Sequence, residues 1–374
     1  MTLTYDILFR DLHRAYFAAR RKKRGKDYQR EFESRLETNL RELCDDLYRR
    51  RYRARPSTCF IITDPKRREV FAADFRDRIV HHLYFNYVHE MLERTFIADS
   101  YSCIRKRGTS YGIRRLERHI RQASLNYTED CYVLKMDVKG YFMHIDRRRL
   151  LEITLKRLDR MSVHRIMKRH PQTWGDMLDM DFVRYLTREI IMLNPMENCA
   201  IHGSPRDWDD LPHDKSLFHA PTGCGLPIGN LTSQLFSNVY LGEFDDFMKR
   251  TLKCRHYGRY VDDFYVVSPD NAWLRSLAMP VKCFLEKEMG LDIQSGKTVI
   301  CPTRMGVEYL GAYLKPWRTY VSRTTLNRMS KKWKTWHEET NPRLLAARIV
   351  SNRGFLCQRS GAHLSLADFK CPKS

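Results

Sequence analysis

The stretch CRHYGRYVDDFYVV, residues 254–267, decides how the rest of the chain is interpreted. Aromatic and β-branched residues on both sides of Val261-Asp262-Asp263 predict a β-hairpin with two carboxylates at its turn. Adjacent carboxylates repel each other strongly unless cations lie between them. The pair therefore favours a magnesium-dependent phosphoryl-transfer site, although a bare Asp-Asp is also common in ordinary acidic turns.

A third carboxylate lies upstream, at the end of another apolar run. The run YVLKMD, residues 132–137, ends on Asp137, and Lys139-Gly140 breaks the pattern directly afterwards. This pattern predicts a buried strand that carries a carboxylate at its end. Two metal ions about 4 Å apart need oxygen ligands from separate segments. Asp137, Asp262 and Asp263 are therefore our candidate catalytic residues and metal ligands.

The order of these motifs resembles that of reverse transcriptases. A strand ending in aspartate is followed by an aromatic residue and phenylalanine, and then by Tyr-x-Asp-Asp. Further blocks stand in family order at residues 65–70, 75–80, 290–298 and 309–311, so the resemblance spans about residues 50–316. It implies an α+β right-hand polymerase with fingers, a palm built on an antiparallel sheet with flanking helices, and a short helical thumb. It also implies an RNA-directed DNA polymerase, a nucleotidyltransferase that uses two Mg²⁺ ions, for which Mn²⁺ can substitute.

The resemblance predicts the domain boundaries. We expect a helical extension at 1–50, fingers at 51–130, a palm at 131–316 with an inserted helical and loop segment at about 150–225, and a basic helical thumb at 317–374. An apolar stripe of the extension contains Phe32, Leu36, Leu40, Leu43 and Leu47. The basic run at 20–26 is either a solvated loop or a nucleic-acid or partner contact. We expect no RNase H, maturase or endonuclease domain in the remaining length.

The aligned motifs also imply nucleotide-binding residues. Lys66 and Arg68 align with residues that contact the incoming triphosphate, a task that suits cationic side chains. Phe142 aligns with the aromatic residue that packs under the sugar and excludes a 2′-hydroxyl. A core phenylalanine is the alternative, and both roles are compatible.

Other positions follow from the same alignment. Val138 offers only its backbone carbonyl as a metal ligand, and Lys297 approaches the leaving pyrophosphate, where a cation or proton donor lowers the barrier. The alternative for Lys297 is a surface lysine beside a strand. Leu310 and Gly311 belong to a block that resembles the primer-grip hairpin. The segment 331–337 interleaves cations and aromatics, as expected of a thumb helix that grips a duplex, although its tryptophans can be core residues.

The block GLPIGNLTSQ, residues 225–234, carries the subfamily information. It has Ile228-Gly229 and Ser233-Gln234 where group II intron and retron enzymes have Gln-Gly and Ser-Pro, and it resembles the reverse transcriptases of diversity-generating retroelements. We expect Gly229 to allow close backbone approach, and Thr232 or Ser233 to cap a helix. The amide of Gln234 can bond to a base, a ribose or the backbone.

Ile228 and Arg68 are our candidates for the low fidelity that this subfamily implies, since we expect Ile228 near the nascent base pair and Arg68 against the dNTP. An apolar side chain in place of the usual glutamine removes a polar contact near the nascent base pair. A looser pair fits error-prone copying, which the resemblance implies at template adenines. The alternative is that Ile228 only packs.

Composition agrees with a nucleic-acid enzyme. The chain has 374 residues and a formal net charge of +22, which favours a polyanionic partner. No stretch approaches 18 consecutive apolar residues, and the first residues do not form a signal peptide, so we expect no membrane partner. The 11 cysteines are scattered and form no Cys-x-x-Cys pair, which indicates reduced thiols in a cytoplasmic protein rather than zinc ligands.

The partners implied by the resemblance are an RNA template, a primer or cDNA, dNTPs, and a small, basic, helical accessory variability protein. Such an enzyme is cytoplasmic and encoded by a bacterium or a phage. One alternative is a retron-like or group II intron-like reverse transcriptase with another role. Another is an inactive palm that serves as an RNA-binding scaffold.

Overall fold

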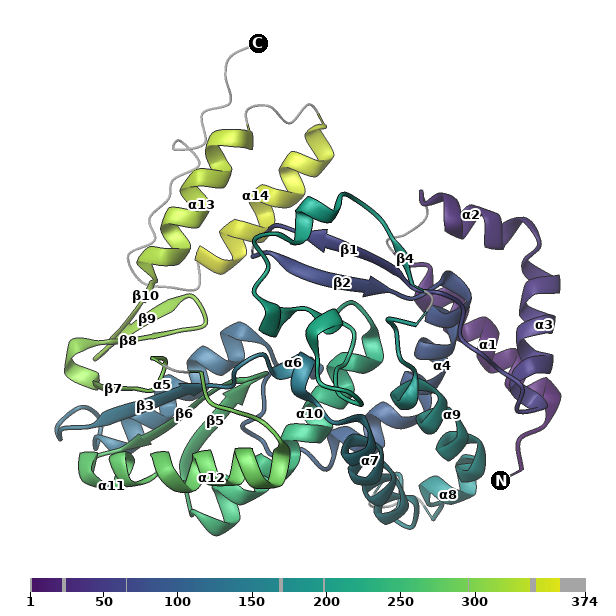
Figure 1. Cartoon of the computed structure of the whole chain (residues 1–374). Helices are drawn as coiled ribbons and strands as arrows, with labels where there is room; N and C mark the ends of the chain where they lie inside the picture. Colours follow the sequence, from purple (N-terminus) through teal and green to yellow (C-terminus); the bar gives the residue numbers. More distant parts are fainter. Residues whose placement is uncertain are drawn as a thin grey trace. The chain divides into compact units, whose positions relative to one another are not determined.

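The structure divides into two compact units. Figure 1 labels its helices and strands. The computed structural model describes residues 2–21, 25–64, 66–167, 171–197, 199–294, 296–336 and 341–356. Unit 1 contains Met1–Ile97, Val138–Phe247 and Cys283–Asp292, and unit 2 contains Ala98–Asp137, Met248–Lys282 and Ile293–Ser374. The predicted boundaries of extension, fingers, palm and thumb stay a prediction. Within the basic run at 20–26, residues 22–24 lie outside the described part.

Unit 1 is mainly helical. Its helices are α1 (Tyr5–Ala19), α2 (Asp27–Ser34), α3 (Leu36–Tyr48), α4 (Phe75–Glu93), α6 (Tyr141–His144), α7 (Arg147–Ser162), α8 (Trp174–Met177), α9 (Met180–Met192) and α10 (Leu231–Asp246). The predicted stripe near the N-terminus is divided between α2 and α3, and its members Phe32, Leu40, Leu43 and Leu47 are buried. Helix α4 packs against α1, α7, α9 and α10, which explains why it has buried residues on most of its faces.

A small sheet of unit 1 has the order β2-β1-β4, with β1 (Thr58–Ile62), β2 (Arg68–Ala72) and β4 (Ala200–Ile201). Strands β1 and β2 are antiparallel, whereas β4 runs parallel to β1. Side chains alternate along β2, so Glu69 and Phe71 are buried while Arg68 is exposed. The sheet therefore presents a charged residue on one side and packs the insertion after α9 on the other.

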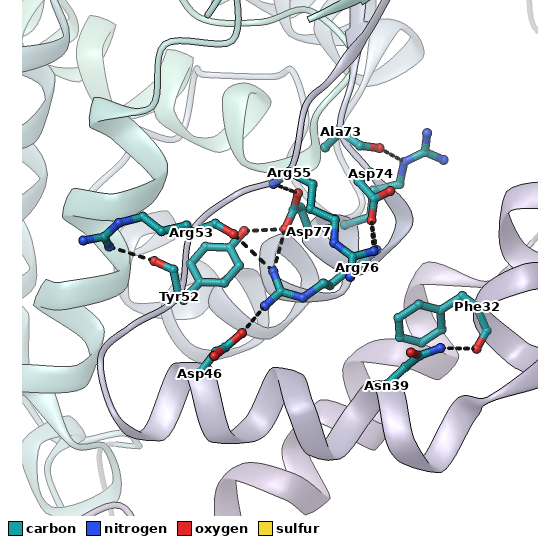
Figure 2. Close-up of polar contacts among 11 residues, drawn as sticks. Phe32, Asn39, Asp46, Tyr52, Arg53, Arg55, Ala73, Asp74, Arg76 and Asp77 are labelled. Atoms are coloured by element: carbon teal, nitrogen blue, oxygen red, sulfur yellow. Dashed lines mark hydrogen bonds and ion pairs between the residues drawn. The ribbon is translucent and has the colours of Figure 1, made fainter. Parts of the chain in front are cut away.

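The block at 75–80 anchors the start of α4 through a buried polar network (Figure 2). The Asp77 carboxylate accepts hydrogen bonds from the Tyr52 hydroxyl at 2.8 Å and the Arg55 backbone N–H at 2.7 Å. Arg76 donates to Asp46 at 2.6 Å. Burial raises the pKa of Asp77 to about 6. These bonds connect α3, the segment before β1 and α4.

The second unit is built on an antiparallel sheet of order β5-β6-β3-β7. Its strands are β3 (Tyr132–Asp137), β5 (His256–Tyr260), β6 (Asp263–Ser268) and β7 (Val299–Pro302), and its helices include α5 (Thr109–Ala123) and α11 (Asn271–Ser276). Ile113, Leu116 and Ile120 of α5 pack into a core with Val133 of β3 and Val267 of β6. Helix α12 (Ala278–Met289) contains a boundary between the units and ends before Gly290, which adopts φ 63°, the left-handed conformation common for a glycine that follows a helix.

Among the described residues after 306, unit 2 contains a second sheet followed by two helices. The elements are β8 (Val307–Tyr309), β9 (Ala312–Lys315), β10 (Arg318–Val321), α13 (Arg323–Thr335) and α14 (Pro342–Leu356). Arg318–Val321 was expected to be helical and is a strand, because the turn at Pro316-Trp317 returns the chain to pair with β9. Trp333 packs against a buried cluster, and His337 lies outside the described residues. No helix among the described residues is long and apolar enough to cross a membrane.

Candidate active site

Two of the predicted carboxylates face each other across neighbouring strands of unit 2. Strand β3 ends at Asp137, strand β6 begins at Asp263, and the two residues are paired in register. Asp262 lies beside them in the two-residue turn that joins β5 to β6. Directly opposite residues on antiparallel strands have Cβ atoms about 5 Å apart. The structure therefore brings the three aspartates together at one end of the sheet, with Asp262 and Asp263 at the hairpin turn and Asp137 at the end of the neighbouring strand.

The three aspartates repel one another, so nearby positive charge is needed before all of them can ionise. Burial raises the pKa of Asp263 to about 7; the carboxylates of Asp137 and Asp262 act in the same direction, and the ammonium groups of Lys135 and Lys297 act against it. A carboxyl group in this environment ionises readily only when cations are near.

Lys297 supplies one such cation. Its ammonium group donates a hydrogen bond to the Asp137 carboxylate, and this bond is the main cause that raises the pKa of Lys297. The Gln294 backbone N–H donates to the Asp137 carbonyl at 2.8 Å, which connects the segment before Lys297 to the end of β3. The lysine side chain is exposed. It therefore neutralises a carboxylate and remains accessible to a ligand.

The turn between the carboxylates has a strained backbone. Val261 adopts φ 56°, a left-handed conformation that is an outlier for a β-branched residue. Its carbonyl accepts a hydrogen bond from Arg259 Nη1 at 2.8 Å, and its N–H donates to Ser102 Oγ at 3.3 Å. Arg259 is only 1% exposed. Sequence reasoning missed both partners; the one available signal was an arginine inside an otherwise apolar and aromatic strand.

Lys135 is a second residue that the motifs did not indicate. It precedes Asp137 by two positions, so the two side chains leave β3 on the same face. Its Nζ donates to the Glu308 carbonyl at 2.7 Å and lies 6.0 Å from the centre of the Tyr309 ring. Lys135 thus connects the carboxylate-bearing strand to β8.

The predicted primer-grip residues form the turn between β8 and β9. Leu310 adopts φ 49° and Gly311 φ 81°, and the Gly311 carbonyl accepts a hydrogen bond from the Ser322 N–H at 2.9 Å. A Cβ on Gly311 would lie 2.8 Å from Thr325 Oγ1. The glycine is therefore required both by the backbone conformation and by the close approach of α13.

The donor chemistry of the carboxylate group fits a hard divalent cation. Mg²⁺ prefers carboxylate oxygens, and here three carboxylates, one with a strongly raised pKa, share one end of a sheet. Val138 directly follows Asp137 and has a buried side chain, so its carbonyl is the group it can offer. Within the described residues, no three acidic, histidine or cysteine side chains are close enough to enclose an ion. In this conformation the cation on Asp137 is the ammonium of Lys297.

Unit 1 contains the predicted triphosphate contacts. Arg68 begins β2 and Lys66 lies two residues before it, and both side chains are exposed. The residue after Arg68, Glu69, is buried. Its carboxylate accepts hydrogen bonds from Trp208 Nε1 at 2.7 Å, Ser216 Oγ at 2.8 Å and the Leu217 N–H at 2.6 Å. The insertion after α9 is therefore bonded to the strand that carries Arg68. These bonds join residues far apart in sequence, and no local pattern indicated them.

Phe142 and Ile228 pack against the same cluster, whose buried members are Cys59, Phe71, Met143 and Leu217. The Ile228 carbonyl accepts a hydrogen bond from the Phe71 N–H at 3.0 Å, and the Leu226 N–H donates to the Phe142 carbonyl at 2.8 Å. Both side chains are only partly buried. The structure thus brings these two candidates together in unit 1, where each packs against the cluster and stays partly exposed.

The start of α10 differs from our expectation. Asn230 occupies the N-cap without a side-chain hydrogen bond, so the predicted caps Thr232 and Ser233 are wrong. Thr232 Oγ1 instead lies 2.8 Å from His81 Nδ1 of α4. Gly229 does allow close approach, since a Cβ there would lie 2.9 Å from Val70 Cγ1. Gln234 is exposed on the first turn of the helix.

The comparisons with known proteins agree with the motif order. Residues 66–314, more than half of the 374, match the family model described as "Reverse transcriptase (RNA-dependent DNA polymerase)". Curated proteins give no match.

Solved structures of telomerases are similar to this chain. The apo telomerase from Candida tropicalis truncated from its C-terminal domain is 12% identical with a TM-score of 0.49, over 72% of this chain and 56% of that one. The telomerase from Candida albicans in complex with the TWJ fragment of telomeric RNA is 13% identical with a TM-score of 0.47, over 75% and 50% respectively. The chain thus spans about half the length of these structures.

Proposed function

The chain belongs to the reverse transcriptase (RNA-dependent DNA polymerase) family, and from that membership we propose that it copies an RNA template into DNA by two-metal nucleotidyl transfer. The observation that carries the proposal is the pairing of Asp137 with Asp263, with Asp262 in the adjoining turn. Asp137, Asp262 and Asp263, with the Val138 carbonyl, are the residues that would hold two Mg²⁺ ions. Bound Mg²⁺ supplies charge stabilisation at the attacking and the leaving oxygen.

The residues around the carboxylates have complementary tasks in this reaction. Lys297 is exposed and already bonded to Asp137, so it is placed to transfer its contact to a phosphate oxygen of the substrate. Its ammonium group then stabilises or protonates the leaving pyrophosphate. Arg259 and Ser102 orient the turn, and Lys135 orients β8 next to the carboxylates. Leu310 and Gly311 contact the primer strand.

Residues of unit 1 select the nucleotide. Lys66 and Arg68 bind the triphosphate through their exposed cationic groups. The open side of Phe142 packs under the deoxyribose and excludes a 2′-hydroxyl, while its other side packs on the cluster that it shares with Ile228. Gln234 is accessible to the nascent pair or the template backbone.

The finer assignment within the family is the enzyme of a diversity-generating retroelement. It is supported by Ile228-Gly229 and Ser233-Gln234 in the block 225–234. Ile228 presents an apolar side chain beside the cluster that carries Phe142, so a mismatched pair loses little binding relative to a matched one. The partners of such an enzyme are its RNA template, the cDNA, dNTPs and a small basic accessory variability protein, in the cytoplasm of a bacterium.

A primer-extension assay tests the polymerase proposal. The purified full chain is given an RNA template, a DNA primer and dNTPs, with Mg²⁺, with Mn²⁺, or with a chelator. We expect extension with either metal and none with the chelator. Asp262→Asn should lower the rate by roughly a thousandfold or more, because a metal ligand is lost. Asp130→Asn, which removes an exposed carboxylate of the same unit, is the matched control. Near-normal extension by Asp262→Asn would contradict the metal site.

Sequencing of the same cDNA tests the finer assignment. We expect errors concentrated opposite template adenines in the wild type and fewer of them in Ile228→Gln, since each ~1.4 kcal/mol of discrimination changes the error frequency tenfold. A wild-type error rate that is low and even across the four template bases removes the retroelement assignment and leaves the polymerase proposal intact.

A further inference from the structure

Three arginines lie in a row on the outer side of α5. Arg114, Arg118 and Arg121 are exposed, and their spacing of four and three residues places them on one stripe of the helix. The opposite side of α5, with Ile113 and Leu116, packs against the sheet that carries the aspartates. The stripe therefore faces away from the catalytic carboxylates within this unit.

These arginines have no carboxylate partner among the described residues. Many other surface arginines do, for example Arg10 and Arg14 with Asp11. On α5 itself, Arg115 is bonded to the buried Asp99 at 2.7 Å and belongs to the interior. Like charges three and four residues apart destabilise a helix by a few tenths of a kcal/mol per pair. A row of uncompensated guanidinium groups is consequently suited to an external anion.

An exposed tryptophan adjoins this row. Trp317 is 62% exposed and occupies the turn between β9 and β10 with φ 66°. Trp317 follows Pro316 as the second residue of a two-residue turn. A type II turn favours glycine or asparagine at this position. The indole packs edge-on against Tyr127 at 4.9 Å, and the Arg121 guanidinium lies 5.9 Å from its centre. A strained backbone that presents a large apolar ring to solvent indicates a binding role rather than a folding role.

We propose that this surface binds single-stranded RNA outside the polymerase site. We call it the α5 face and define it as Arg114, Arg118, Arg121, Gln122, Asn126 and Trp317. All of these residues except Trp317 also line one shallow hollow, together with Glu117. The choice of RNA rests on the proposed function, since an RNA template is the long polyanion that such an enzyme binds. The binding itself does not depend on catalysis.

The chemistry of the α5 face fits an unpaired strand. The arginine row extends over about 10 Å, from seven residues at 1.5 Å each, which suits contacts to successive phosphates. Trp317 offers a face on which one base stacks, and stacking of this kind requires a base that is not paired in a duplex. Gln122 and Asn126 are exposed amides beside the row. Asn126 Oδ1 accepts a hydrogen bond from Arg121 Nε at 3.2 Å. The NH₂ group of Asn126 and the amide of Gln122 can therefore bond to a ribose 2′-hydroxyl or a base edge.

The test is RNA binding by the full chain in the absence of divalent metal. Binding of a labelled single-stranded RNA is measured by fluorescence anisotropy over a series of salt concentrations. Excess unlabelled RNA–DNA template–primer duplex fills the proposed polymerase site. Arg114→Gln/Arg118→Gln/Arg121→Gln should weaken binding at least tenfold and reduce the salt-dependence slope by about 2, because each lost phosphate contact removes about 0.7.

The tryptophan is tested separately. Trp317→Gly keeps the turn, because glycine adopts positive φ without strain. It should weaken binding about tenfold through lost stacking and leave the salt slope unchanged. The control Arg10→Gln/Arg14→Gln/Arg184→Gln removes the same number of charges from arginines that are paired with aspartates, and should bind RNA like the wild type.

Two results would overturn the proposal. In the first, the arginine variant and the tryptophan variant both bind RNA with the affinity and the salt slope of the wild type. The α5 face would then be a site for an acidic protein partner instead of RNA. The other is an equal loss in the control variant, which would reduce the effect to net charge. Primer extension on a short template is measured in parallel and should be retained by every variant. Loss of extension in the wild type would contradict the polymerase proposal without affecting the RNA-binding result.

Discussion

Val261 stands in a backbone conformation that costs a β-branched residue about 1–3 kcal/mol. The strain persists because its carbonyl and its N–H are both bonded, to Arg259 and Ser102 respectively. Since Asp262 and Asp263 follow directly in the chain, the same two bonds fix the direction in which both carboxylates point. Arg259 is therefore a positioning residue for the catalytic turn.

Arg259→Met is expected to lower kcat about a hundredfold while the KM for dNTP changes little, because a displacement of about 1 Å at a reacting group has an effect of that size. Steady-state primer extension measures both constants. Arg259→Lys, which keeps one donor, should be intermediate. Adding Val261→Gly to Arg259→Met should recover part of kcat, since glycine adopts φ 56° without strain. Equal kcat in wild type and Arg259→Met, with lower thermal stability only, would reduce Arg259 to a folding role.

Strand β2 and the insertion after α9 act as one element. Besides the three bonds to Glu69, Arg67 donates to the Asp207 carbonyl at 2.6 Å and pairs with Asp210 at 3.0 Å. Glu69→Ala leaves three donors without an acceptor, two of them from the side chains of Trp208 and Ser216. An unsatisfied buried donor costs about 1–3 kcal/mol, so we expect the free energy of unfolding to fall by roughly 3 kcal/mol. Urea denaturation measures this loss.

Arg68→Ala is the matched control for Glu69→Ala. It changes the residue that directly precedes Glu69 in the same strand, on the exposed side. Its free energy of unfolding should stay within about 0.5 kcal/mol of the wild type. In contrast, its KM for dNTP should rise at least tenfold if Arg68 contacts the triphosphate. Glu69→Ala with unchanged stability would show that the insertion does not depend on this carboxylate.

Elements with a strong local pattern were predictable, and contacts between distant segments were not. The hairpin at 256–268 and the strand ending at Asp137 follow from alternation and turn residues. The caps proposed at the start of α10 failed because Thr232 is bonded to His81 of another helix. The strand β10 was missed because its pairing depends on a turn in which a tryptophan replaces glycine. No sequence motif indicated Lys135 or Arg259, because Lys135 donates to the Glu308 carbonyl and Arg259 donates to the Val261 carbonyl and to Ser100 Oγ, and none of these pairings follows a local pattern.

Each unit has a buried histidine that should make stability depend on pH. Burial lowers the pKa of His81 in unit 1 and of His119 in unit 2 to about 4. An unfolded histidine titrates near pH 6.5, so between pH 6.5 and 4 the unfolded state binds more protons than the folded state. The free energy of unfolding therefore falls as the pH is lowered through this window. At pH 5 the loss is about 2 kcal/mol per histidine.

His81→Asn tests this dependence. Asparagine can still bond to Thr232 but has no charge at any of these pH values. Urea denaturation at pH 7 and pH 5 should give a smaller difference between the two conditions for His81→Asn than for the wild type, by about 2 kcal/mol. If the free energy of unfolding changed by the same amount between pH 7 and pH 5 in both proteins, His81 would have to be neutral in the unfolded chain or charged in the folded one.

The division of each unit into three chain segments has a consequence for synthesis on the ribosome. Helices α1 to α4 are complete by residue 93, yet unit 1 also requires Val138–Phe247 and Cys283–Asp292. At 5–20 residues per second, translation from residue 97 to residue 292 takes roughly 10–40 s. During that interval the nascent chain exposes the apolar surfaces of α4 that α7, α9 and α10 later cover. Chaperones that bind nascent apolar segments should therefore associate with this chain early, and its yield should fall in cells that lack them.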